Sequence, residues 1–143
     1  MQFYKEIKNI TEETFTKYGV ICEHKDPSKE YEPLVIVNSK GWIWAVLTFK
    51  HKKIEKIECH PTSKESFEPV FGTTIIVLAP PENPDQTEAF LLDKPVMLHE
   101  GVWHNVFTLS ESSRVKITEN NDVTCVYHDL SSPVKAVLVY QNA

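Results

Sequence analysis

Hydrophobic and polar positions along this chain follow the pattern of β-strands joined by turns. Runs of roughly four to eight β-branched and aromatic residues are separated by Pro, Asn, Asp, Ser and Gly, which tolerate turn geometry. Strands are therefore predicted at Leu34–Val37, Trp42–Phe49, Lys53–His60, Phe67–Val70, Thr73–Leu78, Ala89–Leu92, Val96–His99, His104–Leu109, Arg114–Thr118, Val123–His128 and Val134–Tyr140.

Residues that typically start and end a helix occur at the right spacing only near the start of the chain. Asn9 or Thr11 can cap a helix, Glu12 and Glu13 suit its positive N-terminal end, and Gly19 can terminate it. We expect one short helix there, docked on the strand that follows.

Many short strands without long helices between them predict an all-β barrel or sandwich, because a parallel sheet would need a helix at each crossover. The segment Trp42–Phe49 is apolar at nearly every position, which is typical of a strand covered on both faces. The length of 143 residues suits one domain, 1–143, and no repeat or low-complexity linker divides it.

Composition and charge narrow the classes of partner. The chain is 41% hydrophobic and 24% charged, with a formal net charge of -5 and no basic block longer than His51-Lys52-Lys53. A nucleic-acid partner is not expected, since duplex binding needs a clustered basic face.

No apolar run reaches membrane-spanning length and the N-terminal residues lack a signal peptide's apolar core, so we expect a cytoplasmic protein without a membrane partner. The cysteines, which are odd in number and widely spaced, are expected to be reduced thiols: Cys22, Cys59 and Cys125.

Ionisable side chains gather on one face of the predicted strand Lys53–His60. Alternation with a period of two places one set on that face, namely Ile54, Lys56, Glu58 and His60, and turns Glu55, Ile57 and Cys59 to the other. Inside a barrel, such charges need to pair with each other or to meet a ligand or metal. The alternative is an exposed, charged edge strand.

A second candidate cluster is His99–His104. Gly101 permits a tight turn, and His104 then opens a new strand, where a histidine can face the mouth of a pocket. A lone histidine is more commonly a hydrogen-bonded structural residue than a ligand. This cluster therefore indicates a functional site only when it is considered together with the first.

Both clusters resemble the two motifs of the cupin superfamily. Glu58-Cys59-His60, followed by Glu65 and Gly72, has the spacing of the first motif, with Glu58 in place of its first histidine, and His99–His104 resembles the second. The resemblance implies a cupin-type double-stranded β-helix barrel with a short N-terminal helix, and the alternative is an immunoglobulin-like sandwich. It also implies a possible divalent metal held by Glu58, His60, Glu65 and His104.

A closer resemblance is to the ureidoglycolate lyase family, formerly called ureidoglycolate hydrolase. The segments that carry it are Thr11–Ile21, Glu58-Cys59-His60-Pro61, Phe67 and Pro69, Ile75–Pro80, Ala89-Phe90 and Gly101-Val102-Trp103-His104. This resemblance implies cleavage of ureidoglycolate to glyoxylate and urea, a small carboxylate substrate and a homodimer. By it we assign acid and base roles to Glu58, His60 and His104, and substrate binding to Lys56, His99 and Trp103.

Three positions depart from the family pattern. Glu65 stands where glutamine is common, Glu100 where a basic or small residue is common, and Asn105 where a second histidine follows. The added carboxylate favours a metal, because oxygen ligands beside imidazoles suit divalent cations. A metal-binding cupin enzyme acting on another small acid or sugar derivative, and a non-catalytic small-ligand binding module, therefore remain alternatives.

Overall fold

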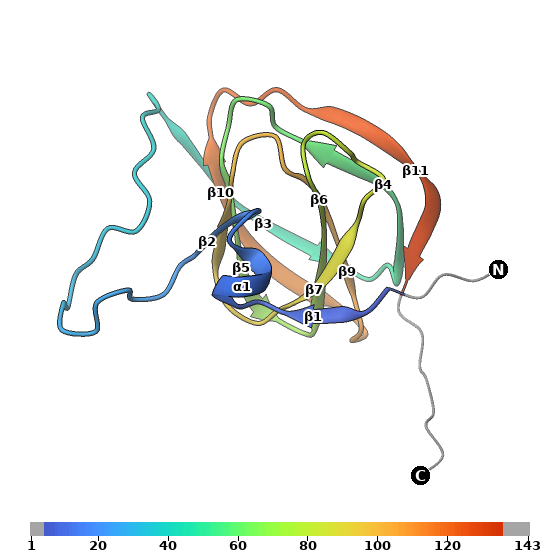
Figure 1. The fold of residues 1–143 in the computed structure, drawn as a ribbon, viewed down its shortest axis with the longest axis horizontal. Coiled ribbons are helices and arrows are strands. Elements are labelled where there is room, and N and C mark those ends of the chain that lie inside the picture. Colours follow the sequence, from blue (N-terminus) through green and yellow to red (C-terminus); the bar gives the residue numbers. More distant parts are fainter. Residues whose placement is uncertain (1–4, 136–143) are drawn as a thin grey trace, which may run out of the picture.

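The computed structural model describes residues 5–135, which fold as a β-barrel with one short helix (Figure 1). Its elements are β1 (Ile7–Asn9), α1 (Glu12–Phe15), β2 (Gly19–Ile21), β3 (Trp42–Phe49), β4 (Lys53–Cys59), β5 (Glu65–Phe71), β6 (Thr74–Ala79), β7 (Glu88–Leu92), β8 (Val96–Leu98), β9 (Trp103–Thr108), β10 (Ser113–Asn120) and β11 (Val126–Lys135). The all-β prediction is confirmed.

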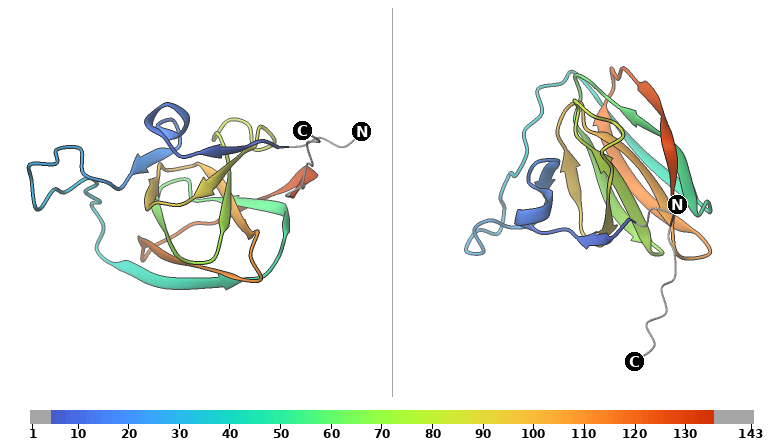
Figure 2. Two further views of the ribbon diagram at one scale, coloured as in Figure 1. Left: turned by 90° about the horizontal axis from the view of Figure 1, so that it is seen from below. Right: turned by 45° about the vertical axis from the view of Figure 1, so that its right-hand side comes forward.

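Two sheets face each other across the barrel. One has the strand order β1-β7-β6-β9-β4-β11 and the other the order β2-β8-β5-β10-β3. From β3 to β6, and again from β7 to β10, consecutive strands alternate between the sheets, so the chain winds around the barrel (Figures 1 and 2). This winding is the predicted cupin-type double-stranded β-helix, with the short helix at its N-terminal side.

The period of two along each strand divides the apolar side chains between two buried clusters. Ile76 and Leu78 of β6 point into the barrel, where they join Phe90 and Val115, while Ile75 points to the opposite face. Along each strand of the six-stranded sheet, one residue therefore faces the interior of the barrel and the next faces the opposite side. A polar residue on the barrel side is removed from water.

The predicted helix is present but shorter than its predicted start and stop residues indicate. Thr11 is the N-cap, and Thr11 and Thr14 form a capping box in which each side chain bonds the other's backbone N–H. The helix ends at Phe15, and Gly19 is the first residue of β2 rather than a helix terminator. A side chain at Gly19 would collide with the backbone of Met97.

The predictions for four strands need correction. Leu34–Val37 forms no strand and lies in the long loop between β2 and β3, which projects from the barrel (Figure 1). The strands predicted at Val123–His128 and Val134–Tyr140 correspond to one strand, β11, and residues 136–140 lie outside the described part. β3 is not covered on both faces, because Trp42, Trp44 and Val46 are exposed on its outer face, and it also borders its sheet.

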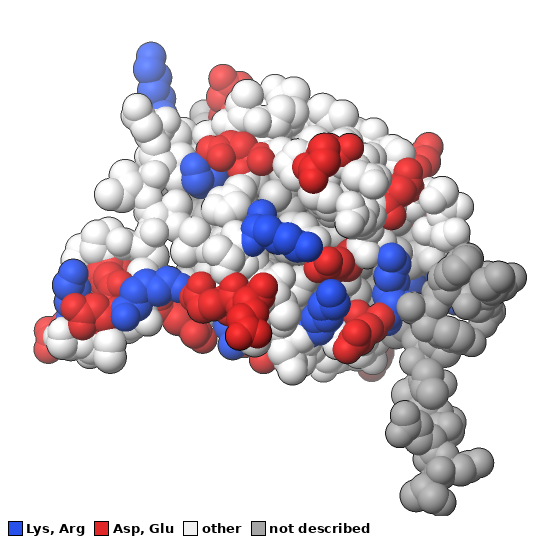
Figure 3. All heavy atoms as spheres, viewed as in Figure 1, with Lys and Arg blue, Asp and Glu red and all other residues white. Residues whose placement is uncertain are grey.

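The surface shows no segregation of charge in the view of Figure 3, where Lys and Arg lie among Asp and Glu. Within residues 5–135, no helix has the length and apolar character needed to cross a bilayer. The cysteines Cys22, Cys59 and Cys125 are free, as predicted.

Candidate metal centre

The alternation predicted along β4 brings Glu58 to the barrel side, and His60 follows directly after the strand. Cys59 points the other way, into the second apolar cluster. His104 lies on the neighbouring strand β9, where its backbone pairs in register with Glu58. Glu65 opens β5 in the opposite sheet. The two sequence motifs therefore meet across the barrel.

The four side chains converge on one point. The Nε2 atoms of His60 and His104 each lie 2.8 Å from Oε2 of Glu65. Glu58 Oε1 lies 3.6 Å from His104 Nε2 and 4.0 Å from His60 Nε2, and one ligand atom from each residue lies within 4.8 Å of all the others. The side chains of the histidines and Glu65 are almost completely buried, whereas that of Glu58 is 32% exposed. The site is thus closed on the inside and open beside Glu58.

Backbone carbonyl groups determine which nitrogen of each ring carries the proton. His60 Nδ1 lies 3.2 Å from the carbonyl oxygen of Thr124, and His104 Nδ1 lies 3.0 Å from that of Val102. A carbonyl oxygen only accepts, so each Nδ1 is the donor, and in the neutral ring Nε2 keeps a lone pair. This is the orientation that metal-ligating histidines adopt.

The donor set fits a divalent metal ion. Despite the short N–O distances, the buried atoms His60 Nε2, His104 Nε2 and Glu65 Oε2 have no hydrogen bond of acceptable geometry. Two imidazole lone pairs and two carboxylates facing one another carry no donor between them, an arrangement that costs free energy unless a cation or protons fill it. Nitrogen and oxygen ligands in this mixture suit first-row divalent ions.

Without a metal, the same geometry retains protons on the imidazoles. Burial alone would lower the pKa of His104, but the carboxylates of Glu58 and Glu65 raise it to about 10. Contact with Glu65 likewise raises the pKa of His60. Burial opposes ionisation of Glu65, yet the close approach of the His104 and His60 imidazoles lowers its pKa to about 2. A metal would therefore displace protons as it binds.

One further carboxylate, Glu119, reaches the cluster and was not identified from the sequence. It lies near the end of β10, pairs in register with Glu65, and places Oε2 3.8 Å from His60 Nε2. Burial and the charge of Glu65 raise its pKa to about 7. The sequence did contain a pattern that could have identified it. Val115 and Ile117 alternate on the barrel side of β10, and if the strand is continued beyond Thr118 the next residue on that side is Glu119.

The residues assigned to substrate binding lie apart from this cluster. Lys56 is exposed, with Nζ 3.9 Å from Asp129 and 5.9 Å from the ring centroid of Tyr127. His99 Nε2 lies 3.3 Å from the carbonyl oxygen of Thr16. Trp103 packs in the second apolar cluster, on the face opposite to His104, and its indole N–H donates to the carbonyl of Pro81 at 3.2 Å.

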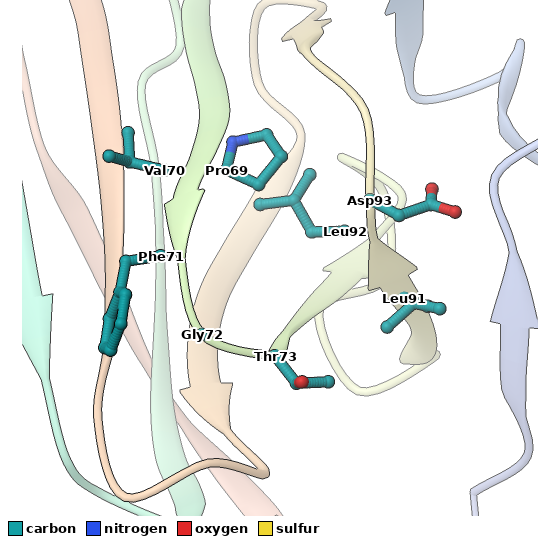
Figure 4. A pocket seen from close by; sticks show the side chains of 8 residues that line it. All are labelled: Pro69, Val70, Phe71, Gly72, Thr73, Leu91, Leu92 and Asp93. Carbon is teal, nitrogen blue, oxygen red and sulfur yellow. The ribbon is translucent and has the colours of Figure 1, made fainter.

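Two hollows flank the ends of β5. One, of about 370 Å³, is lined by Asn38, Ser39, Lys40, Gly41, Thr62, Ser63, Asn120, Asn121 and Asp122, which include the neighbours of Glu119 in the chain. The other, of about 420 Å³, is lined by residues 69–73 and 91–93 at the far end of β5 from Glu65 (Figure 4). The lining of the first also includes Thr62 and Ser63, which follow His60 closely in the chain. Within the barrel, the Phe67 ring lies 5.4 Å from that of His104 and forms part of the wall.

Comparison with protein families agrees with the second resemblance. A family model described as Ureidoglycolate lyase matches residues 33–135. The comparison with curated proteins found no match. Among solved structures, the chain is similar to a mutant of Bacillus subtilis oxalate decarboxylase, with a TM-score of 0.43 and 13% sequence identity. That alignment covers 62% of this chain and 24% of the decarboxylase, so it spans about a quarter of that enzyme.

Proposed function

Because the chain belongs to the ureidoglycolate lyase family, we propose that it is a metal-dependent enzyme that cleaves ureidoglycolate to glyoxylate and urea. The observation that supports this most is the convergence of His60, His104, Glu65 and Glu58, which face one another without a hydrogen-bond donor of acceptable geometry. The buried members of this set would hold the ion, and the exposed side of the cluster faces the substrate.

The reaction needs one group to accept a proton and another to donate one. Cleavage breaks the bond between carbon and the urea nitrogen, while the electron pair of the hydroxyl O–H bond forms the carbonyl of glyoxylate. Glu58, which lies at the open side of the cluster, would accept the hydroxyl proton. Glu119, the other carboxylate beside His60, would in its protonated form donate a proton to the departing nitrogen.

Charge in the site explains why a metal is part of this proposal. The substrate is a carboxylate, yet the cluster contains Glu58, Glu65 and Glu119, and no Lys or Arg within residues 5–135 forms an ion pair with any of them. Lys56 pairs with Asp129, away from the cluster. A bound divalent ion would supply the missing positive charge and polarise the α-hydroxy acid.

The same observation favours a second candidate. Three carboxylates disfavour an anionic ligand and tolerate a neutral one, so a metal-dependent reaction on a neutral sugar derivative fits this site as well. Another small acid would, like ureidoglycolate, depend on the ion for its binding. Turnover of ureidoglycolate separates the two candidates.

The test is steady-state release of glyoxylate from ureidoglycolate, with and without added divalent metal. His60→Asn imitates the shape of the side chain without its ligand nitrogen, so we expect turnover to fall by about two to four orders of magnitude and the bound metal to decrease with it. Glu119→Gln should lower turnover while the metal content stays unchanged, because Glu119 lies outside the ligand set.

Lys56→Met is the matched control, since it removes a nearby charge that points away from the cluster, and it should retain turnover. Absence of glyoxylate release from the wild-type protein under both conditions would refute the lyase proposal. Full turnover by His60→Asn would refute the assignment of the site.

A further inference from the structure

The five-stranded sheet ends on an uncovered edge at β3. This strand pairs with β10 over its whole length, without a register shift, and its other edge has no strand partner within residues 5–135. In the left view of Figure 2, β3 forms the lower border of the barrel. The backbone groups along this edge are therefore available to a further strand.

The hydrogen-bond pattern shows which backbone groups of β3 lie on the free edge. The N–H of Thr118 donates to β5 rather than to β3, and Thr118 pairs in register with Trp44. Thr118 and Trp44 therefore form a non-hydrogen-bonded pair, and Trp44 turns its own N–H and C=O away from β10. Alternation extends this to Val46, whereas Ala45 and Leu47 bond with β10.

Side chains on both faces of β3 are incompletely covered. On the outer face, Trp44 and Val46 are 60% and 55% exposed. On the barrel side, Leu47 is 39% exposed although it pairs with the fully buried Val115, and Ala45 is only partly buried against the core. A strand beside β3 would cover apolar surface on both faces together with the free backbone groups.

The end of β11 lies near the end of this edge. Lys135, the last residue of β11, pairs with Lys53 at the start of β4. Only residues 50–52 connect Lys53 with the end of β3 at Phe49, so the two strand ends are at most about 14 Å apart. A strand that follows β11 can therefore enter the free edge of β3 at its C-terminal end and run antiparallel to it.

The residues that follow β11 have the composition of a strand. Residues 136–143 have the sequence AVLVYQNA, without Pro, Gly or a charged side chain. Valine and tyrosine are typical of strands, and the apolar positions 136–140 are consecutive, so both faces of such a strand would be apolar. A turn of about two or three residues leaves about five or six for pairing, enough to reach from Phe49 to Trp44.

We propose that residues 136–143 add to the free edge of β3 as an antiparallel strand of the five-stranded sheet. This strand lies between β3 and β11, which border the two sheets. It covers a long apolar edge and an uncharged apolar segment, each of which would promote aggregation if left exposed. The competing arrangement is a hairpin with β11. That strand is the poorer partner, because it contains Pro133 and its register shifts between Asp129 and Val134.

The test is amide hydrogen exchange of the full chain, measured by NMR at single residues. In the wild type we expect the amides of Trp44 and Val46 to be protected from exchange. Val139→Pro and Tyr140→Pro each remove one N–H, and adjacent residues of a strand direct their N–H groups to opposite sides, so one of the two variants loses a bond to β3. In that variant the protection factors of Trp44 and Val46 should fall by at least about tenfold.

Two controls show whether the loss is local. The amides of Ala45 and Leu47, which bond with β10, should keep their protection in both proline variants. Ile36→Pro is the matched substitution elsewhere: Ile36 is 83% exposed in the loop before β3 and belongs to no strand, so this variant should exchange like the wild type.

Each other outcome contradicts the proposal. Rapid exchange of Trp44 and Val46 in the wild type, or unchanged protection in both proline variants, shows that residues 136–143 do not cover the edge. Protection that increases with protein concentration identifies a second copy as the occupant. Loss of protection along β11 instead of β3 identifies the hairpin, and equal loss at Ala45 and Leu47 shows that the whole sheet has loosened.

Discussion

His104 shows how burial among carboxylates changes the behaviour of one side chain. In the metal-free protein its pKa is about 10, compared with 6.5 for an ordinary histidine, because Glu58 and Glu65 outweigh the effect of burial. A raised pKa means that the folded chain binds the proton more tightly than the unfolded chain. This contribution to stability is complete below pH 6.5 and is lost as the pH rises through about 10.

Metal-free protein should therefore become less stable as the pH rises from 6.5 toward 10. Glu119 acts in the same direction at lower pH: its pKa is raised from 4.5 to about 7, so its contribution is complete below pH 4.5 and is lost as the pH rises through about 7. The measurement is the free energy of unfolding from urea titrations at a series of pH values, with a chelator present. His104→Asn should reduce the slope, whereas His99→Asn, outside the cluster, should leave it unchanged. A wild-type free energy that does not vary over this range would contradict the ion-pair geometry.

At the scale of single elements, two turns use glycine for different reasons. Gly72, between β5 and β6, has φ of +80°, and a Cβ there would collide with the carbonyl oxygen of Ser112 and with Ser113. Gly101, before β9, has φ of +78°, but the nearest atoms to its Cβ position belong to the Pro81 side chain at 3.5 Å. Backbone strain alone opposes a side chain at Gly101, and a collision is added at Gly72.

Gly101→Ala should lower the free energy of unfolding by about 1 kcal/mol, and Gly72→Ala by more than about 2 kcal/mol. Thermal or urea unfolding of the two variants provides the comparison. Equal losses would show that the turn after β5 relaxes and removes the collision. Since Gly101 N–H donates to the carbonyl of His60 at 2.9 Å, metal content should be compared as well.

Alternation along a strand was sufficient to predict much of the site. At the end of β4 it placed Glu58 and His60 on the barrel side and Cys59 opposite, as the pleat of a half-buried strand requires. Ile54 was predicted on the face of Glu58, but it packs with Ile57 and Cys59 in the second apolar cluster, because the pairing with β11 shifts register there. Glu119 was missed because strand ends are weakly encoded: nothing in the residues after Thr118 shows that β10 continues to Asn120. Lys56 shares the period of Glu58 but lies where the strand reaches solvent.

The position of a strand within a sheet could not be predicted in this way. An apolar run such as Trp42–Phe49 is typical of a strand covered on both faces, and the chain alone does not show that this strand borders the sheet. Leu34–Val37 has the composition of a strand but finds no neighbouring strand, and backbone hydrogen bonds to a neighbour are what define one. Which strands pair with each other depends on the whole fold and cannot be inferred from the residues of one strand.

At the scale of the whole molecule, the candidate metal centre draws its residues from both sheets. Glu58 and His104 belong to the six-stranded sheet, His60 follows β4, and Glu65 comes from the five-stranded sheet. Sheet-on-sheet packing already rests on the apolar cluster inside the barrel. A cation at the convergence point would add a bond between the layers and remove the repulsion among their carboxylates.

Divalent metal should therefore raise the thermal midpoint of the protein. An ion present at about 100 times its dissociation constant adds about 2.7 kcal/mol to the folded state, which corresponds to roughly 5 to 10 °C for a chain of this size. Elemental analysis of protein purified without an affinity tag identifies the ion, and calorimetry before and after chelation measures the shift. Glu65→Gln keeps the volume of the side chain but removes the charge that faces both imidazoles, so it should abolish the shift, whereas His99→Gln should retain it. A shift of equal size in Glu65→Gln would place the ion elsewhere in the molecule, because no other side chain in the cluster approaches both Nε2 atoms as closely.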